Sequence, residues 1–175
     1  MGGLIDDLLQ LSRVGRAEIH RSRLNLAEIA RAIVADLEKR EPERRVLVDI
    51  EELLMADVDS RLMRVALENL LGNAWKFTVN VPQPHVQFTS EPTANGPAFV
   101  VRDSGAGFDM TYVEKLFRPF QRLHSTTEFP GTGIGLATVH RIVDRHGGRV
   151  WAQGSVGSGA AIYFTIPPMG SRGAW

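Results

Sequence analysis

Helical and strand-like patterns alternate along this chain, and their order limits the fold more than any other feature of the sequence. Apolar residues recur at spacings of three and four in the long helical segments. Helices are expected over residues 4–20, 24–41, 60–77, 110–117 and 134–146. Strands are expected over residues 45–50, 85–89, 98–102, 149–152 and 160–166. This mixture predicts an α/β fold, a two-layer sandwich of a mixed sheet with helices on one face.

Residues between these elements supply their boundaries. Asp57, Asp59 and Ser60 offer N-cap side chains to the long helix that follows them. Residues 91–97, rich in proline, asparagine and glycine, predict a hairpin loop. Residues 118–133 show no periodicity, and a loop of that length in a compact domain is usually functional.

Composition excludes several classes of protein. The 175 residues are 43% apolar and 23% charged, which suits one globular domain. Twenty basic residues balance twenty acidic ones, so charge gives no support for nucleic-acid binding. Without cysteine there is no disulfide, thiolate metal site or thiol nucleophile. The apolar runs are too short to span a bilayer and no signal peptide is visible, so we expect a cytoplasmic chain without membrane contact.

A polar stripe runs along the helix expected over residues 60–77. Asn69, Asn73 and Lys76 stand at positions i, i+4 and i+7, so they share one narrow face. An asparagine carbonyl oxygen can bind Mg²⁺, and a lysine ammonium can bind phosphate. Taken alone, the helix fits a solvated surface better, so the stripe needs support from elsewhere.

A carboxylate stands at the end of the strand over residues 98–102. Asp103 is followed by Gly105 and Gly107, which let the backbone pass close to a flat ligand. Because a carboxylate only accepts hydrogen bonds, Asp103 would bind an amino group such as that of adenine. The alternative is a common glycine-rich turn closed by the aspartate side chain.

A glycine-rich segment opens the last helix, and its exposed N–H groups and helix dipole favour an anion. The segment consists of Gly131, Thr132, Gly133, Ile134, Gly135 and Leu136. A dinucleotide fingerprint would need glycine at Leu136 or Thr138, and a P-loop would need a Gly-Lys pair, which is absent. We therefore expect phosphate binding of another kind.

Together these segments resemble the motifs of bacterial sensor histidine kinases, in the order of that family. The N, G1, F and G2 boxes correspond to residues 68–78, 103–108, 116–122 and 131–136. The resemblance covers about residues 24–168 and implies an ATP-binding catalytic domain with the Bergerat α/β sandwich. Residues 120–124 and 128–131 also resemble the phytochrome-type branch.

The resemblance implies ATP and Mg²⁺ as cofactors and gives each motif residue a role. Asn69 would coordinate Mg²⁺, and Asn73 and Lys76 would contact the phosphates. Glu68 is similar to an acidic residue proposed to act as a base, and Asp103 would bind the adenine amino group. Glu68, Asn69 and Lys76 are thus the catalytic candidates.

The other motif residues would shape the nucleotide site. Gly105 and Gly107 would let a lid hinge, and residues 131–136 would meet the phosphates, the glycines through their backbone N–H groups. Phe117 and Phe120 would anchor the lid, although ordinary core packing explains them equally well.

The family's phosphoacceptor motif, His-Glu/Asp-x-x-x-Pro, is missing. His20, His85, His124, His140 and His146 all lie in other settings. Residues 1–20 resemble the C-terminal part of the second dimerisation-bundle helix, followed by the catalytic domain over 21–168 and a tail over 169–175. We therefore expect a fragment that does not autophosphorylate alone. Its partners would be the upstream helix with the acceptor histidine, a response-regulator receiver domain and, in the full-length protein, a second copy.

Several alternatives stay open. The apolar stripe of residues 4–14 could dock onto the following domain or form half of an intermolecular bundle. The chain could instead be an ATPase of the same fold, with Glu68 activating water. It could also be a nucleotide-sensing module without catalysis, or an anti-sigma serine kinase, which would not need the N-terminal helix.

Overall fold

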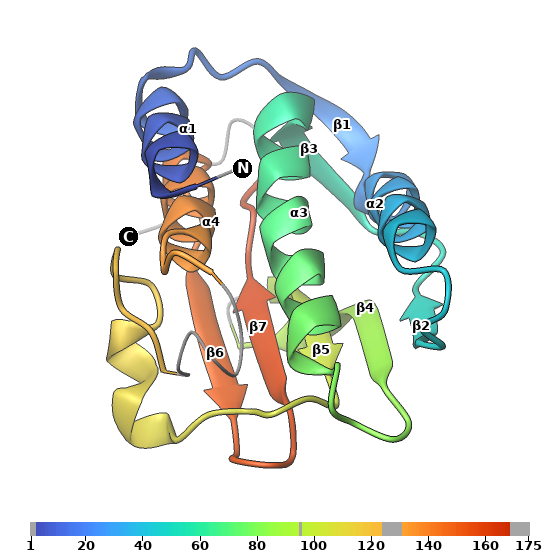
Figure 1. Ribbon diagram of the computed structural model, residues 1–175. Helices are drawn as coiled ribbons and strands as arrows, with labels where there is room; N and C mark the ends of the chain where they lie inside the picture. The colour runs from blue at the N-terminus through green and yellow to red at the C-terminus, as the bar shows by residue number, and fades with distance from the viewer. Residues whose placement is uncertain (1–2, 95, 124–130, 169–175) are drawn as a thin grey trace.

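A five-stranded mixed sheet forms one layer of the molecule (Figure 1). The computed structural model describes residues 3–94, 96–123 and 131–168. The strands of this sheet are β2 (Leu47–Ile50), β4 (His85–Thr93), β5 (Gly96–Asp103), β6 (Val150–Gly154) and β7 (Ala160–Phe164). Their order is β2-β4-β5-β7-β6. β2 is parallel to β4, and the other neighbours are antiparallel.

Helices cover one face of this sheet and form the second layer (Figure 1). They are α2 (Leu26–Arg40), α3 (Ser60–Phe77) and α4 (Gly135–Arg145). A further helix, α1 (Leu4–Arg16), packs against α4. The predicted two-layer α/β sandwich is thereby confirmed. None of the helices in the described part of the chain combines the length and apolarity that crossing a bilayer requires.

The core lies between α3 and the sheet. Phe88 and Phe99 pack against Phe164, with ring centroids 6.4 and 5.3 Å away from it. Trp75 and Leu67 of α3 are fully buried in the same cluster. Burying a large apolar side chain contributes about 1.5–3 kcal/mol, so this layer fixes α3 on the sheet.

The bounds predicted for the helix at residues 60–77 are confirmed. Asp59 caps α3, because its Oδ1 accepts hydrogen bonds from the N–H groups of Arg61 and Leu62. The helix ends at Phe77, and the hydroxyl of Thr78 donates back to the carbonyl of Ala74. The caps fix where α3 begins and ends, and the apolar face that packs on the sheet sets the direction of the polar stripe.

The structure corrects the expected N-terminal helices. Residues 21–25 form β1 (Arg21–Asn25), which pairs with β3 (Met55–Asp59) in a separate two-stranded antiparallel sheet. The helix expected over residues 4–20 ends at Arg16, because Ala17 turns to an extended backbone. The helix expected from residue 24 begins at Leu26, after Asn25 accepts the N–H of Ala27.

The hairpin of β4 and β5 is longer than expected, because residues 91–93 and 96–97 belong to the strands. Pro92 faces Pro97 in the ladder. At both prolines the strand pairs on one side only. β2 pairs with β4 only as far as Phe88, and β7 pairs with β5 only from Phe99 onward. A missing N–H costs no ladder bond there. The short helix expected near residues 110–117 is the 3₁₀ helix Met110–Lys115.

Candidate functional site

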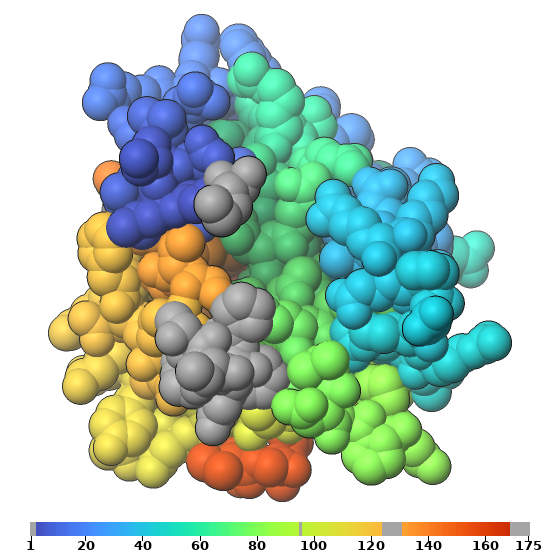
Figure 2. Space-filling view, in the orientation of Figure 1, coloured from blue at the N-terminus to red at the C-terminus, as the bar shows by residue number. Residues whose placement is uncertain are grey.

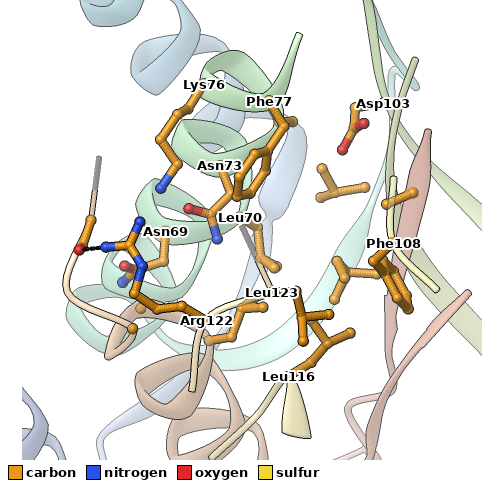
Figure 3. A pocket seen from close by; sticks show the side chains of 18 of the residues that line it. Asn69, Leu70, Asn73, Lys76, Phe77, Asp103, Phe108, Leu116, Arg122 and Leu123 are labelled. Atoms are coloured by element: carbon orange, nitrogen blue, oxygen red, sulfur yellow. Dashed lines mark hydrogen bonds between the residues drawn. The ribbon is translucent and has the colours of Figure 1, made fainter. Parts of the chain in front are cut away.

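A cavity of about 220 Å³ opens between α3, the ends of β5 and β7, and the segments on either side of residues 124–130. Residues from all four sequence motifs line it. Figure 3 shows the polar side chains of α3 on one side of this cavity and Asp103 on the other. The cavity therefore joins two chemically different ends.

The predicted polar stripe of α3 forms one end of the cavity. Asn69, Asn73 and Lys76 project from successive turns of the helix to the same side (Figure 3). The Nδ2 of Asn69 donates to the carbonyl of Val65 at 2.9 Å, so the other amide atom, Oδ1, is left as an acceptor. A Cβ on Gly135 would stand 2.7 Å from this Oδ1, so glycine at that position keeps the space beside the oxygen open.

Two cationic groups gather at the same end. Burial and the nearby positive charge of Arg122 both lower the pKa of the Lys76 ammonium from its usual 10.5. Arg122 also donates a hydrogen bond to the carbonyl of Gly131 (Figure 3). Because like charges close together repel, this pair favours an anion between or beside them.

The carboxylate of Asp103 lies at the opposite end, near apolar walls. Its Oδ1 accepts the N–H of Gly105 at 2.8 Å. Burial raises the pKa of the Asp103 carboxyl to about 6, although hydrogen bonds from the N–H groups of Gly105 and Ala160 lower it. Leu70, Val101 and Phe108 line the cavity as well. A half-desolvated acceptor among apolar side chains suits a flat ring that carries an amino group.

Glycines bring the backbone close together around Asp103. Gly107 has φ +65°, and a Cβ there would lie 1.9 Å from the carbonyl oxygen of Ser155. A Cβ on Gly105 would lie 2.4 Å from the carbonyl oxygen of Phe77. The two glycines therefore allow the strand end to pack closely, Gly105 against α3 and Gly107 against the β6–β7 turn. This is a packing role in addition to the hinge role expected for them.

The glycine-rich segment forms the remaining wall beside α3. Gly133 has φ +79°, and its carbonyl accepts the N–H of Phe120 at 3.0 Å. Gly131 approaches Lys76 so closely that a Cβ would lie 3.0 Å from the Nζ. The segment thus lies against the end of α3 and leads into the first turn of α4.

Most of the predicted site residues line this cavity, and three do not. The lining ones are Asn69, Asn73, Lys76, Asp103, Gly107, Gly131, Thr132, Gly133, Gly135 and Leu136. Glu68 lies outside, with its side chain 47% exposed and bound to the guanidinium of Arg64 at 3.0 Å. Ile134, within the glycine-rich segment, is buried, and Gly105 donates its N–H to Asp103 without lining the cavity.

The structure adds lining residues that the sequence did not single out. Phe77, Phe108 and Arg122 come from the motif segments, so the motifs themselves point to them. Asp7 comes from α1, and its Oδ2 accepts a hydrogen bond from the hydroxyl of Thr132, 125 positions away. No local pattern in the sequence signals a contact of this range.

The two expected lid anchors, Phe117 and Phe120, differ from each other in their surroundings. The ring of Phe117 lies 6.1 Å from that of His140. Phe120 is 56% exposed and has φ +66°, which is uncommon for a residue with a side chain. The expectations for His124 and for residues 128–130 lie outside the described residues.

The histidines of the described residues have settings that differ from a phosphoacceptor motif. His146 is buried, and its ring nitrogens bond to the carbonyl of Ile142 and the N–H of Asp59. His85 pairs with Asp49 at 2.6 Å. His20 is exposed and lies 3.7 Å from Glu18.

Comparison with known proteins shows the family of the chain that forms this cavity. A family model described as histidine kinase-, DNA gyrase B- and HSP90-like ATPase matches residues 58–170, which include all four motifs. The chain belongs to this ATPase family. It is 35% identical over 171 residues to cyanobacterial phytochrome A of Nostoc sp. strain PCC 7120, across 95% of the chain and 22% of that relative.

Solved histidine kinase structures share the fold of this ATPase-family chain. Full-length ShkA in complex with AMPPNP matches with a TM-score of 0.74 and 28% identity, over 92% of the chain and 34% of ShkA. The nucleotide-free catalytic domain of histidine kinase ThkA matches with a TM-score of 0.69 and 26% identity, over 85% of the chain and 97% of that domain. The chain is thus similar to the ATP-binding catalytic domain of histidine kinases, and it spans about a fifth of the length of the curated relatives that it matches first.

Proposed function

We propose that the cavity binds ATP with its adenine at Asp103 and its triphosphate between the polar face of α3 and residues 131–136. One observation carries this proposal: a single cavity joins a half-buried carboxylate among apolar side chains to a face of amides and ammonium. The first end matches the amino edge of adenine, and the second matches a polyanion. The structure of ShkA is a complex with AMPPNP, an ATP analogue, which supports ATP as the ligand.

Asn69 fits the role of Mg²⁺ ligand. Its amide orientation is fixed by Val65, so the carbonyl oxygen is available on the cavity side. Within the described residues there is no cluster of three acidic or histidine side chains that could hold a metal by itself. Mg²⁺ typically takes few protein ligands and completes its shell with phosphate oxygens and water. The ion would neutralise part of the phosphate charge.

The reaction that we propose is transfer of the ATP γ-phosphoryl group to a histidine on a bundle helix outside this chain. From there the group would pass to an aspartate of a response-regulator receiver domain, in the cytoplasm and within a dimer of the full-length protein. Phosphoryl transfer of this kind depends mainly on positioning and charge stabilisation. Lys76 would supply positive charge, and the N–H groups of residues 131–135 would orient the phosphates.

The location of Glu68 favours phosphotransfer over hydrolysis. A residue that activates water would have to reach into the cavity, whereas Glu68 points outside and pairs with Arg64. A histidine presented from outside the cavity could still reach Glu68, so the role of assisting base is compatible with this location. We propose residues 21–168 as the catalytic domain and α1 as the end of a bundle helix.

Labelled ATP tests the proposed reaction. The chain alone should bind ATP and acquire no stable acid-labile label, since its described histidines lie outside the acceptor setting. Addition of a separate helix bearing an acceptor histidine in the family motif should produce label on that helix. Label on the chain alone would contradict the missing acceptor. Rapid turnover to ADP that Glu68→Gln abolishes would support an ATPase instead.

A further inference from the structure

The N-terminal helix α1 reaches the proposed nucleotide cavity. Asp7 lines the cavity, and its carboxylate accepts a hydrogen bond from the Thr132 hydroxyl. Thr132 stands in the segment that we assign to the phosphates. The contact therefore places a negative charge from α1 beside the position of the triphosphate.

Two polar contacts hold α1 along α4, one near each end of the helix. At the end of α1, Arg145 donates to the carbonyls of Val14, at 2.7 Å, and Ala17. Near its beginning, Asp7 binds Thr132, just before α4. Figures 1 and 2 show α1 lying over α4 beside α3. The position of α1 is thus linked to both ends of the helix that the glycine-rich segment opens.

The apolar contribution to this docking is small. Val14 is the one residue of α1 that is buried in the described structure. Ile5 and Leu9 remain 74% and 48% exposed. An element with few buried apolar contacts opens at low cost, so a modest repulsion can shift its equilibrium between docked and released states.

We propose that docking of α1 and binding of the triphosphate oppose each other, with Asp7 as the residue that couples them. This inference rests on the proposed function. The Asp7 carboxylate repels a polyanion placed at Asn69 and Lys76 and uses the Thr132 hydroxyl as its own donor. Coupling between two binding events is reciprocal, so ATP must weaken the docking of α1 as much as docking weakens ATP binding.

Asp7→Asn tests the charge, with Asp6→Asn as the matched control. The asparagine oxygen can still accept from Thr132, whereas Asp6 is exposed and does not line the nucleotide cavity. Calorimetric titration should show ATP binding about fivefold tighter for Asp7→Asn at low salt, with less gain as salt rises. Adenosine binding should be unchanged in both variants. ATP affinity equal to that of Asp6→Asn, or weaker than wild type, would overturn the inference.

Arg145→Gln tests the other contact, because Arg145 does not line the cavity. Its loss should also tighten ATP binding, since it releases α1 without changing the site. In the wild-type chain, hydrogen exchange of α1 should become faster when ATP is added. Slower exchange would overturn the inference even if the variant fails to fold. If wild type binds neither ATP nor adenosine, the proposed function itself fails.

Discussion

Replacing Asp103 by asparagine should stabilise the fold and weaken ATP binding at the same time. In the folded chain burial raises the pKa of this carboxyl from 3.8 to about 6, because ionisation is costly in the cavity. A difference of that size corresponds to about 3 kcal/mol of stability lost by the ionised form. Asparagine keeps the shape without a charge to bury, so it escapes this cost.

The sign follows from the two protonation states. Below about pH 4, Asp103 is neutral in the folded and unfolded chain, so wild type carries no penalty. As pH rises through 6, the folded carboxyl ionises and the stability contributed by its neutral form is lost. Asparagine gives up one acceptor, at about 0.5–1.5 kcal/mol. The variant should therefore be about 2 kcal/mol more stable than wild type at pH 7 and no more stable at pH 4.

Urea unfolding followed by circular dichroism at pH 4 to 8 measures this difference. Asp144→Asn is the control, since Asp144 is exposed. ATP affinity of Asp103→Asn should fall about 10- to 100-fold at pH 7, because a hydrogen bond to a charged group is lost. A stability difference independent of pH, or a variant less stable than wild type at pH 7, would refute the assignment of a buried, ionised carboxylate at this position.

Three further substitutions test other parts of the site. Gly72→Ala should stabilise α3 by about 1 kcal/mol in thermal unfolding, because the new Cβ would meet nothing within 4 Å beyond its own stretch of helix and glycine is a weak helix former. A lower melting temperature would contradict this. Gly107→Ala should destabilise the fold by more than 2 kcal/mol in urea, since its Cβ would meet the Ser155 carbonyl at 1.9 Å; an unchanged midpoint would show that this turn adapts. Lys76→Met should weaken ATP binding at least tenfold and leave adenosine binding unchanged in calorimetry; equal losses for both would move Lys76 away from the phosphates.

Local patterns predict well the elements that line the cavity. The bounds of α3 follow from the Asp59 cap and the apolar spacing, and the stripe of Asn69, Asn73 and Lys76 follows from helical geometry. Most of the residues taken from the motifs line the cavity for the same reason: each motif occupies the end of a helix or strand, and these ends meet.

Long-range features could not be predicted from the sequence. The pairing of β1 with β3 joins Arg21 to Asp59; β1 shows no alternation of polar and apolar residues, and that of β3 covers only four residues. The contact of Asp7 with Thr132 depends on how α1 packs on α4. Glu68 pairs with Arg64 one turn earlier in the same helix, but the packing of α3 on the sheet decides that this pair lies outside the cavity.

A structure of the chain with Mg²⁺ and a nonhydrolysable ATP analogue tests the proposed function most directly. We expect the adenine amino group within hydrogen-bond distance of the Asp103 carboxylate. The phosphates should lie against Asn69, Asn73 and the N–H groups of residues 131–135. A nucleotide bound with its base away from Asp103, or a cavity that stays empty at saturating analogue, would contradict the assignment of this site.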